Sequence, residues 1–153
     1  MRPVPTWDEY FLGIAKAGNA RSKDPSTQVG CVLVNERGKV ISIGYNGMAP
    51  GVVETPELWE RPLKYQHVIH SETNAVGNAA QEGHPTRNST AYCTHFPCLP
   101  CAKSLAAAGV RYVVAIALVK SGAWDTSCAE AAEFLDKAGI AWEIVEEKRC
   151  GVA

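Results

Sequence analysis

His70-Ser71-Glu72 and, further along, Pro97-Cys98-Leu99-Pro100-Cys101 are two short stretches that must meet in space, and the rest of the chain is organised around them. Cys98, Cys101 and His70 together offer two sulfur ligands and one nitrogen ligand, a set that suits zinc in a tetrahedral shell. Three protein ligands leave the fourth position to water, which is the arrangement of a catalytic zinc site. The two-residue spacer lets both sulfurs reach one ion at the start of a helix, where the positive end of the helix favours thiolates.

Glu72 lies two residues beyond His70, so its carboxylate can stand beside the metal without ligating it. A carboxylate there can take a proton from water on the metal, because zinc lowers the pKa of that water from about 15.7 to about 7. The complete pattern, H-x-E followed downstream by P-C-x-x-C, is typical of zinc-dependent nucleobase deaminases. The sequence therefore predicts a hydrolytic enzyme in which Glu72 transfers the proton.

A C-x-x-C pair by itself also occurs in redox proteins and as half of a structural zinc site. A structural site would need a fourth Cys or His nearby, and the close candidates are Cys93 and His95. Cys93 belongs to the alternating run 90–94, which we interpret as a strand in which this thiol is a small buried apolar group. The joint pattern, with a helical run after each half, favours the catalytic interpretation.

Length and composition indicate a single zinc-dependent domain over residues 1–153, with 46% hydrophobic and 20% charged residues. We expect a cytoplasmic protein with no membrane partner, because no apolar run could span a bilayer and the N-terminus has no signal-peptide core. The six cysteines are expected to be metal ligands or free thiols. A net charge of -1 argues against nucleic acid as the main partner.

Hydrophobic periodicity and turn signals predict the order α-β-β-α-β-α-β-α-β, an α/β protein in three layers (α-β-α) with a mixed five-stranded sheet and helices on both faces. Residues 48–66 are expected to be irregular, and 122–125 a loop. The metal would lie where two helix N-termini converge, since each half of its motif opens a helix. The expected helices are 7–20, 71–81, 98–108 and 128–138, and the expected strands are 29–34, 40–45, 90–94, 111–119 and 141–145.

Several polar and aromatic side chains outside the motif keep two interpretations open. The loop 20–27 is either a plain connection or a phosphate contact, for which Arg21, Ser22 and Lys23 supply donors. Asn46 is either a turn residue or an amide presented to a ligand at the end of a strand. Tyr65 either fastens its loop down or lies near a bound base, and Trp124 is either a packed cap or a lid over the site.

With these residues in hand, the chain resembles the deoxycytidylate (dCMP) deaminases, the nucleotide-monophosphate branch of the cytidine deaminase superfamily, over residues 7–145. Beyond the zinc motif, the resemblance rests on four runs: RSKDPSTQVG at 21–30, GYNG at 44–47, ERPLKY at 60–65 and THFPC at 94–98. It implies a cytidine deaminase-like fold. It also implies hydrolysis of dCMP to dUMP and ammonia, with dUMP feeding thymidylate synthesis.

The resemblance also implies roles for individual residues. Zinc would be bound by His70, Cys98 and Cys101, and Glu72 would shuttle the proton. Asn46 would hold the sugar hydroxyl. Ser71 would lend its backbone N–H to the pyrimidine carbonyl, and the nucleotide site would be lined by Ser22, Lys23 and Thr27 on one wall and by Thr94, His95 and Phe96 on the other.

Members of this branch are usually homo-oligomers, often hexamers, and many are activated by dCTP and inhibited by dTTP, with Mg²⁺ accompanying the effector. The chain departs from the pattern at Ser71, where Ala is usual. It also departs at 48–52, which lack the Cys of the Pro-x-Gly-Cys run in many regulated members. The first change alters the pocket, and the second weakens the expectation of effector control.

Other functions fit parts of the pattern. One is deamination of a 5-substituted dCMP, and another is deamination of tRNA or single-stranded DNA, which would need a basic face. A non-catalytic zinc-stabilised or nucleotide-sensing module is the alternative of a different class. Glu72 argues against it, because a structural site has no use for an unligated carboxylate beside an open metal position.

Overall fold

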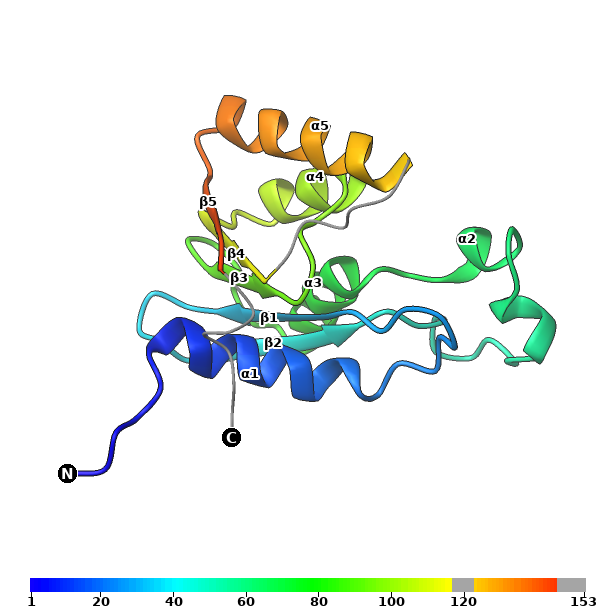
Figure 1. Cartoon of the computed structure of the whole chain (residues 1–153), viewed down its shortest axis with the longest axis horizontal. Coiled ribbons are helices and arrows are strands. Elements are labelled where there is room, and N and C mark those ends of the chain that lie inside the picture. The colour runs from blue at the N-terminus through cyan, green and yellow to red at the C-terminus, as the bar shows by residue number, and fades with distance from the viewer. Residues whose placement is uncertain (117–122, 146–153) are drawn as a thin grey trace.

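A five-stranded mixed sheet forms the centre of the computed structural model, which describes residues 1–116 and 123–145 (Figure 1). The strand order is β2-β1-β3-β4-β5. β1 pairs antiparallel with both β2 and β3, whereas the pairs β3–β4 and β4–β5 are parallel. The predicted mixed α/β sheet is therefore confirmed. The strands are β1 (Gly30–Val34), β2 (Val40–Tyr45), β3 (Thr90–Cys93), β4 (Tyr112–Ala115) and β5 (Ala141–Ile144).

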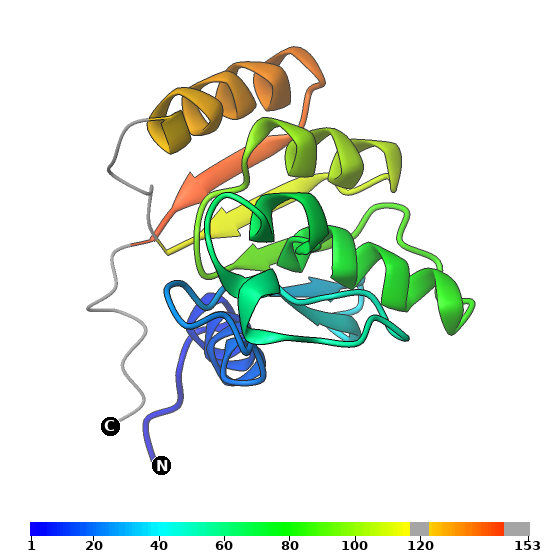
Figure 2. The ribbon, with the colours of Figure 1, turned by 90° about the vertical axis from the view of Figure 1, so that its right-hand side faces the viewer.

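Helices cover both faces of the sheet, as the sequence predicts. α1 packs on one face and α3, α4 and α5 pack on the other (Figures 1 and 2). The segment between β2 and α3 holds two shorter helices and extends at the right-hand end of Figure 1. The helices are α1 (Trp7–Asn19), η1 (Pro56–Trp59, a 3₁₀ helix), α2 (Lys64–His67), α3 (Ser71–Gln81), α4 (Leu99–Ala107) and α5 (Ala123–Lys137).

β1 is buried along its whole length because it lies inside the sheet and both of its faces are covered. Cys31 and Leu33 face the core under α3, α4 and α5, and Val32 and Val34 face the core under α1. This is the two-residue alternation of a strand between two helical layers. The stretch 29–34 therefore reads as continuously apolar in the sequence.

Gly44 sets the distance between β2 and the first turn of α3. A Cβ atom at this position would lie 2.1 Å from the carbonyl oxygen of Ser71 and 2.4 Å from the backbone nitrogen of Ala75. Two hydrogen bonds fasten the contact: Ser42 Oγ donates to the carbonyl of Ala75 at 2.7 Å, and Asn74 Nδ2 donates to the carbonyl of Tyr45 at 2.7 Å. The start of α3, which carries the metal motif, is thus held against the sheet by backbone contacts.

The structure departs from the expected elements in two places. The stretch 48–66 is not wholly irregular, since it contains η1 and the start of α2; four residues each are too few to produce a helical periodicity. The predicted loop 122–125 is wrong beyond its first residue, because α5 already begins at Ala123. Alanine is the best helix former, so Ala123 suits the start of a helix.

Some expectations fall outside the part of the chain that the structure describes. Residues 117–119 of the fourth predicted strand, Gly122 and Cys150 lie there. Within the described ranges, none of the helices has the length and apolar character needed to cross a membrane.

Candidate active site

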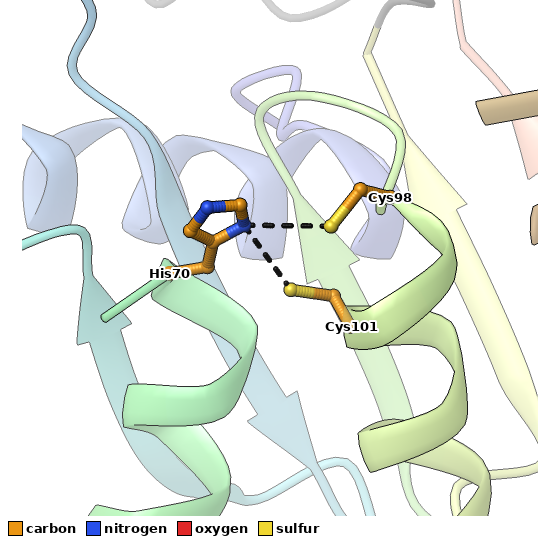
Figure 3. Close-up of side chains that lie close together, drawn as sticks. All are labelled: His70, Cys98 and Cys101. Atoms are coloured by element: carbon orange, nitrogen blue, oxygen red, sulfur yellow. Dashed lines mark hydrogen bonds between the residues drawn. The ribbon is translucent and has the colours of Figure 1, made fainter. Parts of the chain in front are cut away.

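His70 and Cys98 occupy the N-cap positions of α3 and α4, with extended backbone at φ -70°, ψ 155° and φ -73°, ψ 165°. Neither side chain makes a capping hydrogen bond to its own helix. Both point into the space between the two helix starts, where Cys101 joins them from the first turn of α4 (Figure 3). The structure therefore brings together the three predicted metal ligands from two separate helices.

The spacing of these three residues fits one tetrahedral zinc ion. Nδ1 of His70 lies 3.4 Å from Sγ of Cys98 and 3.4 Å from Sγ of Cys101, and all three atoms lie within 4.8 Å of one another. Zinc–sulfur bonds of about 2.3 Å and a zinc–nitrogen bond of about 2.0 Å at tetrahedral angles would separate nitrogen and sulfur by about 3.5 Å. The donor set and its dimensions therefore match a Cys₂His site with one open position.

Cys93 does not complete this group as a fourth ligand. Its thiol is fully buried and lies 3.7 Å from Sγ of Cys31, its directly opposite partner on β1. In the described part of the chain, the only candidate metal group of three or more such residues is His70, Cys98 and Cys101. This placement supports the interpretation of Cys93 as a small core residue and leaves no role for it in a structural zinc site.

The local electrostatics favour a thiolate at Cys98. Hydrogen bonding from Cys101, and then from His70, lowers the pKa of the Cys98 thiol well below its ordinary value. The N-terminus of α4 adds the positive end of a helix dipole at the same point. A thiolate is the form of cysteine that binds a metal, so the site is prepared for a cation.

Glu72 lies in the first turn of α3 and is only 4% exposed. Burial raises the pKa of its carboxyl group. Ser71 Oγ donates a hydrogen bond to Glu72 Oε2 at 3.0 Å, which orients the carboxylate. A buried carboxyl group with a raised pKa suits the transfer of protons near neutral pH, as expected for a general acid–base.

A pocket opens beside the metal-binding group. Its walls come from the segment before β1, the end of β2, the region of α2, the start of α3 and the segment between β3 and α4. Of the predicted substrate-binding residues, the structure places at this pocket Thr27, Asn46, Tyr65, Ser71, His95 and Phe96. The other lining residues are Asp24, Val29, Arg61, Lys64, Val68, His70, Glu72 and Cys98.

Asn46 is held rigidly at the end of β2. Its Oδ1 accepts a hydrogen bond from the backbone N–H of Val29 at 2.8 Å, and its Nδ2 donates to the carbonyl of Thr27 at 2.9 Å and to Asp24 Oδ2 at 3.3 Å. An amide oxygen has two lone pairs, so Oδ1 can accept a second hydrogen bond from a ligand hydroxyl. The side chain is therefore both a structural connection and a possible ligand contact.

Ser22 and Thr94 are not among the residues that line the pocket, and their side chains bond to backbone behind it. Ser22 Oγ donates to the carbonyl oxygen of Asn46 at 2.8 Å. Thr94 Oγ1 accepts from the backbone N–H of Gly30 at 3.0 Å, inside the core. Both residues support the walls of the pocket in this arrangement.

Arg21 and Lys23 are also outside the pocket lining. Both are exposed, and Lys23 Nζ pairs with Glu54 Oε1 at 2.9 Å across the surface. The side chain of Trp124, for which the sequence leaves two interpretations open, lies outside the described part of the structure.

Sequence reasoning assigned no role to three charged residues of the pocket, Asp24, Arg61 and Lys64. Lys64 Nζ lies 2.8 Å from Asp24 Oδ2, and the two side chains are 6% and 4% exposed. Arg61 is exposed, and its guanidinium lies 5.9 Å from the centre of the Tyr65 ring. The clustering of Arg61, Lys64 and Tyr65 within five consecutive residues was a usable signal, but nothing local connects Lys64 to a residue 40 positions earlier.

The chain is similar to known zinc-dependent deaminases. The family model described as the cytidine and deoxycytidylate deaminase zinc-binding region matches residues 5–117. A deoxycytidylate deaminase of Pongo abelii is 36% identical over 141 residues, covering 88% of this chain and 76% of that protein. A deoxycytidylate deaminase of Mus musculus is 39% identical over 114 residues, covering 71% of this chain and 63% of that protein.

Solved structures show the same fold. The dCMP deaminase of the cyanophage S-TIM5, in complex with dCMP and dUMP, superimposes with a TM-score of 0.76 at 24% identity, covering 94% of this chain and all of that one. The apo form of the same enzyme gives a TM-score of 0.74. These likenesses confirm the predicted cytidine deaminase-like architecture.

Proposed function

Because the chain belongs to the cytidine and deoxycytidylate deaminase zinc-binding family, we propose that it hydrolyses dCMP to dUMP and ammonia. One observation carries the proposal: a buried carboxyl group, Glu72, lines the same pocket as the metal ligands His70 and Cys98. Hydrolytic deamination needs an activated water and a group that moves its protons, and the metal ligands and Glu72 would supply them.

Zinc is the metal that the donor set fits, and His70, Cys98 and Cys101 would hold it. Once bound, zinc would lower the pKa of a coordinated water to about 7 and so supply the nucleophile at neutral pH. Two cysteine ligands would offset the charge of the ion. His70 and Cys98 both line the pocket, so a metal ion held by this group would lie beside it.

Glu72 performs the proton transfers in this proposal. Its carboxylate takes a proton from the water as the water oxygen bonds to C4, and it delivers that proton to N3 of cytosine. It then takes the remaining proton from the oxygen on C4 and passes it to the C4 amino group, so that the C4–N bond breaks, the C4 carbonyl forms and ammonia leaves. Its burial and its hydrogen bond from Ser71 keep the carboxyl group oriented through both transfers.

Arg61 and its neighbours favour a nucleoside monophosphate as the substrate. Arg61 lines the pocket from an exposed position, and its guanidinium offers donors in a geometry that matches phosphate oxygens. The relatives of Pongo abelii and Mus musculus are named deoxycytidylate deaminases, and the cyanophage enzyme binds dCMP and dUMP. Asn46 lines the same pocket, and in this proposal its Oδ1 accepts a hydrogen bond from the sugar hydroxyl.

Absorbance-monitored deamination by the zinc-loaded protein tests the proposal. The substrates are dCMP, 5-methyl-dCMP, deoxycytidine and dCTP, each compared for kcat/KM. We expect dCMP to be converted well above deoxycytidine, and Arg61→Ala to raise KM for dCMP while leaving deoxycytidine unaffected. Absence of conversion of every substrate by protein that carries one zinc per chain would contradict the proposal. Preference for 5-methyl-dCMP would redirect it to a modified substrate.

Further properties of the branch stay predictions from the resemblance. They are assembly into a homo-oligomer, often a hexamer in this branch, activation by dCTP, inhibition by dTTP and Mg²⁺ bound with the effector. The cytoplasmic location stays a prediction from the sequence. The same assay with added dCTP or dTTP, with and without Mg²⁺, tests effector control. Light scattering after size-exclusion chromatography tests the oligomer.

A further inference from the structure

We propose that the buried ion pair between Asp24 and Lys64 positions the nucleotide-binding wall of the pocket by clasping the segment before β1 to α2. The inference rests on the proposed function, because the ligand that the wall receives is the nucleotide. Neither residue belongs to the group that would bind the metal. We therefore treat both as positioning residues.

All the hydrogen-bond donors of the Lys64 ammonium group have acceptors in Asp24 and Ser26. Lys64 Nζ donates to Asp24 Oδ2 at 2.8 Å, to Asp24 Oδ1 at 3.0 Å and to Ser26 Oγ at 2.7 Å. An ammonium group has three N–H donors, so these three acceptors use all of them. With side chains 6% and 4% exposed, the pair is shielded from water, and its geometry is fixed on both sides.

Asp24 also holds two residues that line the pocket through hydrogen bonds. Its Oδ1 also accepts hydrogen bonds from the backbone N–H groups of Ser26 at 2.9 Å and Thr27 at 3.2 Å, which closes the turn that presents Thr27. Its Oδ2 accepts from Nδ2 of Asn46 at 3.3 Å. One carboxylate thus holds Thr27 and Asn46, both of which line the pocket, in fixed positions relative to each other.

Lys64 fixes the other segment joined by the ion pair, the residues around α2. α2 has only four residues, which is too short to be stable without tertiary contacts, and Lys64 is its buried residue. Arg61 and Tyr65 line the pocket from the same short segment. The Lys64 ammonium also lies 5.8 Å from the centre of the Tyr65 ring. The position of this rim therefore depends on where Lys64 is anchored.

A buried ion pair is a weak contributor to stability as such. Replacing both partners by neutral side chains of similar size is often harmless to folding, whereas removing one partner leaves an uncompensated buried charge. Stability and positioning can therefore be separated by comparing Lys64→Met with the double variant Asp24→Asn/Lys64→Met. Lys137→Met is the matched control, since it breaks an exposed Lys–Glu pair in α5 whose side chains are 73% and 67% exposed.

The measurements are kcat and KM for dCMP, calorimetric binding of dUMP, and urea unfolding. We expect Lys64→Met to lower the unfolding midpoint and to raise both KM for dCMP and Kd for dUMP by about tenfold or more, because small misplacements of binding groups are costly. The double variant should recover the unfolding midpoint but keep the raised KM and Kd, with kcat close to that of the wild type. Lys137→Met should match the wild type throughout.

Recovery of KM and Kd together with stability in the double variant would overturn the proposal, as would unchanged KM and Kd in both variants. If Lys64→Met does not fold, the double variant alone decides.

A wild-type protein that neither converts dCMP nor binds dUMP would overturn the proposed function instead. The clasp would then be tested by hydrogen exchange of segments 24–29 and 61–68, which should accelerate in the double variant but not in Lys137→Met; equal exchange in the two variants would overturn it.

Discussion

His70 and Cys98 hold equivalent positions in two different helices: each is an N-cap residue, and Nδ1 of His70 lies 3.4 Å from Sγ of Cys98. Both helices pack on the same face of the sheet, α3 against β2 and β1, and α4 beside α3 (Figure 2). The two ligands are therefore brought together by the placement of whole helices. A change that moves either helix start should affect the metal site without touching a ligand.

Glu72→Gln should abolish nearly all turnover while leaving zinc bound. Glutamine keeps the size of the side chain but cannot take up a proton, and loss of a general acid–base group costs about 10²–10⁴-fold or more in rate. Initial rates with dCMP and zinc content by elemental analysis check the prediction. Turnover close to that of the wild type would remove Glu72 from its assigned role.

Cys101→Ser should lose zinc, because Cys101 supplies one of the three ligand atoms. The matched control is Cys93→Ala, which changes a fully buried thiol that lies outside the metal group. It should keep one zinc per chain and lose about 1 kcal/mol of stability from the small cavity. Zinc content after dialysis against a weak chelator separates the two variants, and equal zinc loss in both would contradict the assigned ligand set.

Gly44→Ala should displace the start of α3 and weaken the metal site. The added Cβ would lie 2.1 Å from the carbonyl oxygen of Ser71, and overpacking of this kind costs about 1–3 kcal/mol or more. Gly77→Ala is the control on the same helix, since a Cβ there meets nothing within 4 Å and should stabilise α3 by about 0.5–1 kcal/mol. Urea unfolding and zinc affinity measure both effects, and a harmless Gly44→Ala would refute the close contact.

Asp24 should make stability depend on pH in the acidic range. Burial alone would raise the pKa of its carboxyl group, but hydrogen bonds from Lys64, Ser26 and Thr27 outweigh it and lower the pKa below the ordinary value. A depressed pKa stabilises the fold above the unfolded value of about 3.9, and this stabilisation is lost as the pH falls through the folded value.

Asp24→Asn measures that contribution directly. At pH 7 the variant should be less stable than the wild type by about 3–5 kcal/mol, because Lys64 is left as an uncompensated buried charge. The difference should shrink as the pH falls below about 4, because the unfolded chain then binds a proton at Asp24 that the folded carboxylate, with its lowered pKa, does not yet bind. Urea unfolding of both proteins from pH 7 to pH 3 gives the difference, and a gap that is constant across this range would contradict the buried pair.

Ser71→Ala should reduce kcat by less than about tenfold and leave zinc in place. The substitution removes the 3.0 Å hydrogen bond to Glu72 but keeps the backbone N–H, and one such bond is worth about 0.5–1.5 kcal/mol. Steady-state kinetics with dCMP test this expectation. A loss as large as that in Glu72→Gln would show that the hydroxyl group itself takes part in the reaction.

The chemistry of the site could be predicted from the sequence because it is encoded locally. The types and spacing of His70, Glu72, Cys98 and Cys101 indicate zinc and a proton-transferring carboxylate before any fold is known, and the helices that follow each half are visible as apolar periodicity. The order of strands and helices was equally readable, since β1 alternates between two buried faces. The short helices η1 and α2 were missed because a single turn carries no periodic signal.

The ion pair in the pocket wall became visible only in the tertiary structure. Nothing in the sequence pairs Asp24 with Lys64, which is 40 positions away and contributes to the pocket from a four-residue helix. Lys23, a better phosphate contact by local chemistry, pairs with Glu54 outside the pocket lining instead. Cys98 and Cys101 lie at a spacing set by local helix geometry, whereas the meeting of His70 with them, like the buried ion pair, depends on which segments the sheet and its loops bring together. The sequence alone therefore determined the metal chemistry, and the packing of distant segments determined which polar groups line the pocket.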